Sequence, residues 1–164
     1  MRGRRRMSSE FGLQLLEKQK VRYSYGLTEK QLSRYVKGAL KAKTNSTHQL
    51  FEDLEVRLDN AVYRLGLASS RSGARQLVSH GHFTVNNKKV TIPSYKLSIS
   101  DVIAINGRSK NLGPFQDITK KLKNFEFPQW ISFDPGRGEG KVKGKPKYEK
   151  TFFDLNAVLE FYSR

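Results

Sequence analysis

The sequence predicts an α+β fold, because the spacing of its apolar residues changes part-way along the chain. Between residues 11 and 80, apolar residues recur three and four positions apart, which is the period of amphipathic helices. From residue 83 to residue 105, short apolar runs flank a pair of asparagines, which is typical of strands joined by a tight turn. The apolar stretch at residues 152–162 is expected to pack back on the body of the protein.

The net charge of the chain indicates what kind of molecule it binds. Of the 164 residues, 31 are lysine or arginine and 15 are aspartate or glutamate, which gives a formal net charge of +16. Such an excess favours a polyanion, either nucleic acid or an anionic membrane. No apolar run approaches the ~18 residues that a membrane span requires, which favours nucleic acid. The chain has no cysteine, which excludes disulfides, cysteine-bound zinc and thiol catalysis.

Three helices are predicted in the first 66 residues. The first begins at Ser8 or Ser9, and the second opens at residues 28–31, where threonine and glutamine form a capping box. One face of this second helix is apolar, and a neighbouring face is basic. A further capping box at residues 46–49 opens one continuous helix, which we expect to end at Gly66 in a left-handed cap. The basic face of the second helix carries Lys30, Arg34, Lys37 and Lys41.

A unit of two helices and a small curled sheet is expected over residues 50–106. A serine just before Arg71 starts its second helix. Asn86 and Asn87 form a tight hairpin turn, because asparagine tolerates a positive φ angle. A further short strand is predicted at residues 102–105.

Beyond residue 106 the pattern weakens. A helix is expected within residues 112–127, a short strand at residues 130–133 and a flexible basic loop at residues 136–147. The predicted organisation is a basic arm and N-terminal helical body at 1–49, the helix-and-sheet module at 50–106, and a C-terminal part at 107–164 that packs back on the helical body.

Cations on the module and on the first helices are the candidate RNA-binding side chains. Arg71 and Arg75 lie four residues apart on one helix, and Lys88 and Lys89 lie at the hairpin tip. Arginine binds phosphate bidentately, and RNA helices are recognised mainly by shape and phosphate. The alternative is that these charges are merely solvated. The candidates are Arg4, Arg5, Arg6, Lys18, Lys20, Arg22, Arg34, Arg57, Arg64, Arg71, Arg75, His80, His82, Lys88 and Lys89.

Other motifs give weaker signals. The four arginines of the first seven residues form either an RNA-contacting arm or a solvated tail. His80 and His82 have no nearby carboxylate set, so RNA contact or surface exposure is favoured over a metal site. Asp53 and Arg57 have the spacing of an ion pair within one helix. No nucleophile and base form a catalytic pattern, and we expect no enzyme activity, metal or cofactor.

Several motifs together resemble a known family. The sequence is similar to bacterial-type small-subunit ribosomal protein S4 from about residue 8 to its end, most specifically at residues 57–95. The motifs are FGLQLLEKQKV at 11–21, RLDNAVYRLG at 57–66, ARQLVSHGH at 74–82, IPSY at 92–95 and FYSR at 161–164.

The resemblance implies a helical body from both chain ends with an inserted S4 RNA-binding module. It implies binding to the five-prime domain of small-subunit ribosomal RNA early in assembly, contact with ribosomal protein S5 and neighbouring small-subunit proteins, and a role in translational accuracy. Arg4, Arg5 and Arg6 match the family's basic residues near the channel by which messenger RNA enters. A cytoplasmic ribosome is expected, and an organellar ribosome is the alternative.

The sequence departs from the family at two points, and three other classes of protein are alternatives to this interpretation. Family members usually have residues upstream of this start, some with a zinc-binding cysteine cluster, so either the lineage lost them or the sequence is incomplete. Asn87 stands where the hairpin commonly has glycine. The same module occurs in enzymes that modify RNA and in a small heat-shock RNA-binding protein. An enzyme would need, besides this module, a catalytic domain of on the order of 100 residues. A DNA-binding protein would insert one helix into a groove of the DNA.

Overall fold

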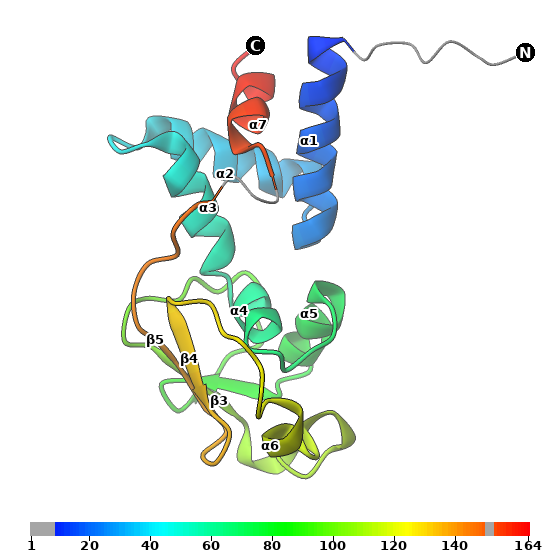
Figure 1. Ribbon diagram of the computed structural model, residues 1–164, viewed down its shortest axis with the longest axis vertical. Coiled ribbons are helices and arrows are strands. Elements are labelled where there is room, and N and C mark those ends of the chain that lie inside the picture. The colour runs from blue at the N-terminus through cyan, green and yellow to red at the C-terminus, as the bar shows by residue number, and fades with distance from the viewer. Residues whose placement is uncertain (1–8, 150–152) are drawn as a thin grey trace, which may run out of the picture. The chain divides into compact units, whose positions relative to one another are not determined.

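Residues 9–149 and 153–164 are described by the structure, a computed structural model in which the chain forms two compact units (Figure 1). Unit 1 comprises the described parts of Met1–Phe51 and Tyr148–Arg164, and unit 2 comprises Glu52–Lys147. Helices occur in both units and a five-stranded antiparallel sheet lies in unit 2, which confirms the predicted α+β class.

Unit 1 is helical and is built from both ends of the chain. The C-terminal helix α7 packs beside the N-terminal helix α1, although the two are far apart in the sequence (Figure 1). The elements of unit 1 are α1 (Glu10–Tyr25), α2 (Glu29–Lys41), the first part of α3 (Ser46–Glu55) and α7 (Leu155–Tyr162).

Local capping sets the ends of α1 and α2. The hydroxyl of Ser9 accepts a hydrogen bond from the backbone of Gly12, and α1 ends at Gly26, whose φ of 66° is left-handed. Thr28 and Gln31 form the predicted capping box, with each side chain bonded to the other's backbone N–H. The first helix therefore begins where a serine was expected to cap it.

The interior of unit 1 combines an apolar core with polar ties between its helices. Lys18 on α1 donates to Glu29 on α2 at 2.8 Å, and Gln14 on α1 donates to Glu160 on α7 at 3.0 Å. Phe11 packs against Phe161, with ring centroids 5.5 Å apart. The fully buried apolar residues are Val21, Leu32, Val36, Ala39, Leu50, Leu155 and Val158.

The continuous helix predicted from residue 46 to Gly66 is wrong. α3 ends at Glu55, and α4 (Leu58–Arg64) begins after Arg57, which is extended with φ −65° and ψ 139°. The chain is extended here because it pairs with a distant segment: Arg57 forms a β-bridge with Lys96, and the N–H of Leu58 donates to Tyr95. These long-range bonds compete with helical ones, and local spacing does not reveal them.

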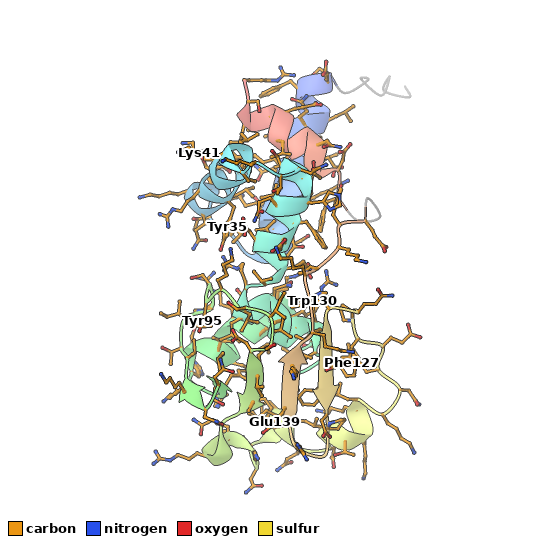
Figure 2. All side chains as sticks on the ribbon, turned by 90° about the vertical axis from the view of Figure 1, so that its left-hand side faces the viewer. Tyr35, Lys41, Tyr95, Phe127, Trp130 and Glu139 are labelled. Atoms are coloured by element: carbon orange, nitrogen blue, oxygen red, sulfur yellow. The ribbon has the colours of Figure 1, made fainter. Side chains whose placement is uncertain are left out.

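Unit 2 places three helices and an antiparallel sheet around one core. Phe83, Leu65 and Ile103 are essentially inaccessible in this core, and Trp130 (labelled in Figure 2) is 6% exposed. The strand order is β2-β1-β3-β5-β4. The elements are α4, α5 (Arg71–Ser79), β1 (Phe83–Val85), β2 (Lys88–Lys89), β3 (Val102–Ile105), α6 (Ile118–Lys121), β4 (Ile131–Asp134) and β5 (Glu139–Val142), with short 3-10 turns at Gly107–Ser109 and Gly113–Phe115.

The hairpin between β1 and β2 has the predicted turn. Asn86 and Asn87 adopt φ angles of 50° and 66°, which confirms the expectation that asparagine replaces glycine there. The side-chain amide of Asn86 also donates to Asp101 at 2.9 Å, and its carbonyl accepts from the backbone of Val102 at 3.0 Å. The turn is therefore fixed to the start of β3.

The segment after residue 106 differs from its prediction. Residues 107–147 belong to unit 2, and only the stretch from residue 148 onward belongs to the helical unit. The expected flexible loop at 136–147 contains β5, which pairs with both β3 and β4. Gly140 faces the core in this strand, because a Cβ there would lie 2.8 Å from a methyl of Leu65. The expected helix within 112–127 is reduced to the single turn of α6 and a 3-10 turn.

Candidate RNA-binding surface

Arg71, the first residue of α5, is held in place by two neighbours in unit 2. Its Nε donates to Oδ1 of Asn60 at 2.9 Å, and its guanidinium lies 4.6 Å from the centre of the Tyr63 ring. Asn60 is only 1% exposed, and its amide donates to the backbone carbonyl of Glu55 at 2.8 Å. A guanidinium stacked and bonded in this way is pre-oriented to present its planar edge to an anion.

Helix capping determines where Arg71 lies. The hydroxyl of Ser70 accepts a hydrogen bond from the backbone N–H of Gly73 at 3.0 Å and so caps α5, which begins at Arg71. On the inner side of α5, Ala74 and Val78 are fully buried. Arg75 is exposed one turn beyond Arg71, and this spacing places both arginines along the same side of the helix.

Further basic residues lie at the end of α5 and on the hairpin. His80 caps the helix and is exposed. Lys89 of β2 lies across Gly81, where a Cβ atom would be 2.3 Å from the lysine Cε. Gly81 has a φ of 79°, which glycine adopts without strain. We call this region the α5 surface, defined by Arg71, Arg75, His80 and Lys89.

Two other candidates in unit 2 lie beside the α5 surface in different environments. His82 is half-buried, with Nδ1 2.8 Å from the hydroxyl of Ser109 and its ring 5.7 Å from that of Phe115. Lys88 is exposed, but neighbouring residues of a strand point to opposite faces, so it does not share the face of Lys89. Of the two, His82 is therefore held by its contacts with Ser109 and Phe115.

Two candidate RNA-binding residues are buried, which corrects their assignment. Arg57 is 2% exposed, and its guanidinium forms two hydrogen bonds of 3.2 Å with the carboxylate of Asp59. Lys18 is 6% exposed and is bound to Glu29. Asp53 and Arg57 do not lie in one helix as expected, because α3 ends at Glu55, and Asp53 bonds Lys96 at 3.1 Å. Burial follows from tertiary contacts, so residue type and spacing could not reveal it.

Arg64 is partly exposed and forms an ion pair with a buried carboxylate. It donates through Nε and Nη2 to both carboxylate oxygens of Glu55 at 3.0 and 2.9 Å. Glu55 is 1% exposed, whereas the Arg64 side chain is 25% exposed. The ion pair with Glu55 therefore compensates much of the charge of Arg64.

The remaining candidates lie in unit 1 or outside the described residues. Lys20 is paired with Glu17 at 2.7 Å, whereas Arg34 is exposed on α2. Arg22 lies over the ring of Tyr23, which is 70% exposed. Arg4, Arg5 and Arg6 are among the residues that are not described.

The positioning residues Asn60 and Tyr63 were not among the predicted site residues. Both lie in the RLDNAVYRLG stretch that carried the strongest resemblance, and that stretch was the available signal. An asparagine in a helix favours the cap or a specific hydrogen bond over a helix interior. An asparagine inside a helical pattern that is rich in arginine is therefore a signal available in the sequence.

Neither a metal cluster nor a membrane helix was found in the part of the chain that the structure describes. Over residues 9–149 and 153–164, no group of three or more histidine and acidic side chains is arranged to hold a metal ion. The helices found in the same residues are too short or too polar to cross a membrane.

Known proteins match almost the whole chain. Residues 1–55 match the family described as Ribosomal protein S4/S9 N-terminal domain, and residues 56–103 match the S4 domain. The small ribosomal subunit protein uS4 of Cutibacterium acnes is 45% identical over 165 residues, which covers 99% of this chain and 82% of the relative. This chain belongs to the uS4 family. The predicted family resemblance is therefore confirmed.

Two further uS4 proteins show similar agreement. Those of Herpetosiphon aurantiacus and Aquifex aeolicus are each 44% identical, covering 98% and 99% of this chain and 78% and 79% of the relatives. The S4 domain match spans α4, α5, β1, β2 and the start of β3, so it contains every residue of the α5 surface. The uS4 family is a family of ribosomal proteins.

Proposed function

We propose that this chain is an RNA-binding structural component of the small ribosomal subunit. The observation that carries the proposal is the α5 surface within the S4 domain, where Arg71 is held by Asn60 and Tyr63 in a chain of the uS4 family. A rigid surface of this kind binds RNA phosphates with little loss of side-chain freedom.

The charge of the whole chain supports ribosomal RNA as the ligand. A net charge of +16 attracts a polyanion over distances set by the ionic strength. Recognition of a folded RNA depends on shape and backbone contacts, and it needs cations fixed on a rigid frame. α5 and the hairpin provide such a frame, since both rest on the core of unit 2.

The finer role follows from the family. We infer that the chain binds the five-prime domain of small-subunit ribosomal RNA before most other proteins, and so starts assembly of that region. It would contact ribosomal protein S5 and contribute to accuracy of decoding. Arg4, Arg5 and Arg6 are proposed to lie near the channel by which messenger RNA enters, on a cytoplasmic ribosome.

We infer no catalytic role. The names of the relatives describe proteins of the small ribosomal subunit, and the carboxylates of Asp59 and Glu55 in unit 2 are buried in ion pairs with Arg57 and Arg64. The other candidate function is a regulatory RNA-binding protein. It would require neither the α1–α7 packing of unit 1 nor a match to the S4/S9 N-terminal domain over residues 1–55.

A reconstitution experiment tests the proposal. The purified chain is added, with no other protein, to full-length small-subunit ribosomal RNA and to the same RNA lacking its five-prime domain. We expect the chain to sediment with the full-length RNA and not with the shortened RNA. Equal binding to both would support the regulatory or generic RNA-binding alternative.

A further inference from the structure

The chain contains one asparagine that is followed by glycine, Asn106, directly after β3. Asparagine is a chemically labile residue, and it is most labile before glycine, because no side chain hinders attack of the next backbone nitrogen on the side-chain amide. Gly107 is exposed, and a Cβ there would have nothing within 4 Å. The fold itself therefore gives no reason for glycine at this position, and it leaves the attacking nitrogen in a solvent-exposed residue.

The backbone around Gly107 favours this attack. Gly107 is the first residue of a 3-10 turn, where an N–H has no acceptor within the turn, and over residues 9–149 and 153–164 its N–H donates to no other backbone carbonyl. The next N–H, that of Arg108, donates to Oδ1 of Asn106 at 3.4 Å. A donor at this oxygen stabilises the negative charge that develops there when Cγ is attacked. Arg108 and Lys110 are exposed cations close by in the chain, and they add a positive field.

The amide of Asn106 also connects the turn after β3 to the end of α5. Its Nδ2 donates to the carbonyl of Gly81 at 3.2 Å, and its backbone N–H donates to the carbonyl of His82 at 2.7 Å. A carboxylate has no hydrogen to donate, so it would face the Gly81 oxygen without a bond. Lys89 of the α5 surface lies across Gly81. A change of Asn106 to an acid therefore acts next to that surface.

We propose that Asn106 is a self-modification site, at which the folded chain slowly converts the amide to aspartate or isoaspartate and so breaks the bond to Gly81. The nitrogen of Gly107 attacks Cγ of Asn106 and loses its proton. A new C–N bond forms, the bond from Cγ to Nδ2 breaks, and ammonia leaves. Water, the only co-reactant, then opens the five-membered succinimide at either of its carbonyls. The bond from Nδ2 to Gly81 restrains the side chain, which keeps the reaction slow.

Mass spectrometry of the aged full chain tests this inference with an internal control. Trypsin places Asn106 in the peptide 97–108 and the exposed Asn111, which leucine follows, in the peptide 111–120, and each peptide holds one asparagine. After incubation at mildly alkaline pH, we expect Asn106 to convert at least about tenfold faster than Asn111. Gly107→Ala places a methyl group in open space, so it should keep the parent's melting temperature and slow conversion of Asn106 at least about tenfold.

A second pair of variants tests the bond to Gly81. Asn106→Asp carries one of the products and should melt at a lower temperature than the parent, whereas Asn111→Asp adds the same charge at an exposed position and should melt as the parent does.

Two results would overturn the inference. One is an Asn106 that stays intact in the folded chain but converts in the chain unfolded by urea, because the fold would then protect the site. The other is an unchanged melting temperature of Asn106→Asp. Weaker binding of Asn106→Asp to five-prime-domain RNA is expected in addition, and that effect alone rests on the proposed function. If the parent chain does not bind this RNA, the proposed function fails, while the mass spectra and melting temperatures still decide the inference.

Discussion

Arg71 and Asn60 are joined by a hydrogen bond of 2.9 Å from the arginine Nε to the asparagine Oδ1. Asn60 is almost completely buried and is fixed in turn to the backbone of Glu55, so the bond connects a surface cation to the interior of unit 2. The ring of Tyr63 covers the guanidinium at 4.6 Å. The position of this cation is thus set before any ligand arrives.

The first prediction concerns charge reversal on the α5 surface. Arg71→Glu with Arg75→Glu should weaken binding to five-prime-domain RNA by more than about tenfold at moderate salt, because two phosphate contacts become repulsive. Folding should persist, because an acid in the first turn of α5 suits the helix dipole. Lys120→Glu with Lys121→Glu makes the same charge change on α6 and is the control. Unchanged affinity of the first variant would remove the α5 surface from the account.

A second prediction separates Arg57 from the RNA-binding residues. Arg57→Ala leaves the carboxylate of Asp59 buried and without its cation, which should lower the free energy of unfolding by about 3 kcal/mol. Lys96→Ala breaks an exposed pair and should cost less than about 1 kcal/mol. Denaturant unfolding followed by fluorescence of Trp130, the one tryptophan of the chain, reports on unit 2. A small effect of Arg57→Ala on stability, together with a large loss of RNA affinity, would show that Arg57 contacts RNA and does not act mainly in the core.

A third prediction concerns Gly66, which has a φ of 73° and lies against the segment after α6. A Cβ there would lie 2.8 Å from a methyl of Leu122 and 3.0 Å from the ring of Phe125. Gly66→Ala should therefore destabilise unit 2 by about 2 kcal/mol or more, from the strained backbone and the crowded contact. At Gly107 a Cβ would have nothing within 4 Å, so Gly107→Ala should change stability by less than about 0.5 kcal/mol. Comparable effects of the two substitutions, measured by Trp130 fluorescence, would argue against this packing.

A fourth prediction concerns the pH dependence of unit 1. Burial raises the pKa of Glu29, but hydrogen bonds from Lys18 and Tyr162 outweigh it, and the pKa lies below its ordinary value of 4.5. The folded state then binds fewer protons than the unfolded state in this range. The stabilisation is complete above pH 4.5 and is lost as the pH falls through the lowered pKa. Because the side chain is 49% exposed, we expect an effect below about 1 kcal/mol.

Helical circular dichroism on acid titration measures this effect. Glu29→Gln should lessen the loss of stability below pH 4.5, and Tyr162→Phe, which removes one of the two donors, should give an intermediate profile. Glu149→Gln removes an acid from an exposed position of unit 1 and should behave as the parent does. An unchanged acid profile in Glu29→Gln would show that the Lys18–Glu29–Tyr162 contact does not control the acid stability of unit 1.

The features that could be predicted from the sequence are those that local chemistry determines. The capping box of Thr28 and Gln31 needs only four neighbouring residues, and the hairpin turn needs only Asn86 and Asn87 with their tolerance of positive φ. The RNA-binding class follows from net charge and from the resemblance, which the uS4 relatives confirm. These conclusions do not depend on how distant segments meet.

The features that were missed depend on such distant contacts. The helix break at Arg57 results from a bridge to Lys96, and β5 exists because β3 and β4 lie on either side of it. Arg57 and Arg71 have the same side chain, but one is buried against Asp59 and the other is held at the surface by Asn60. Residue type gives the chemistry that is available, and tertiary packing decides which side chains can use it.

The most direct test of the central claim is a salt-titrated binding measurement with the parent chain and the five-prime domain of small-subunit ribosomal RNA, with transfer RNA as competitor. The account predicts tight binding that survives the competitor, with an affinity that falls steeply as salt is raised. Equal affinity for both RNAs would contradict it and would leave the chain a generic basic RNA-binding protein.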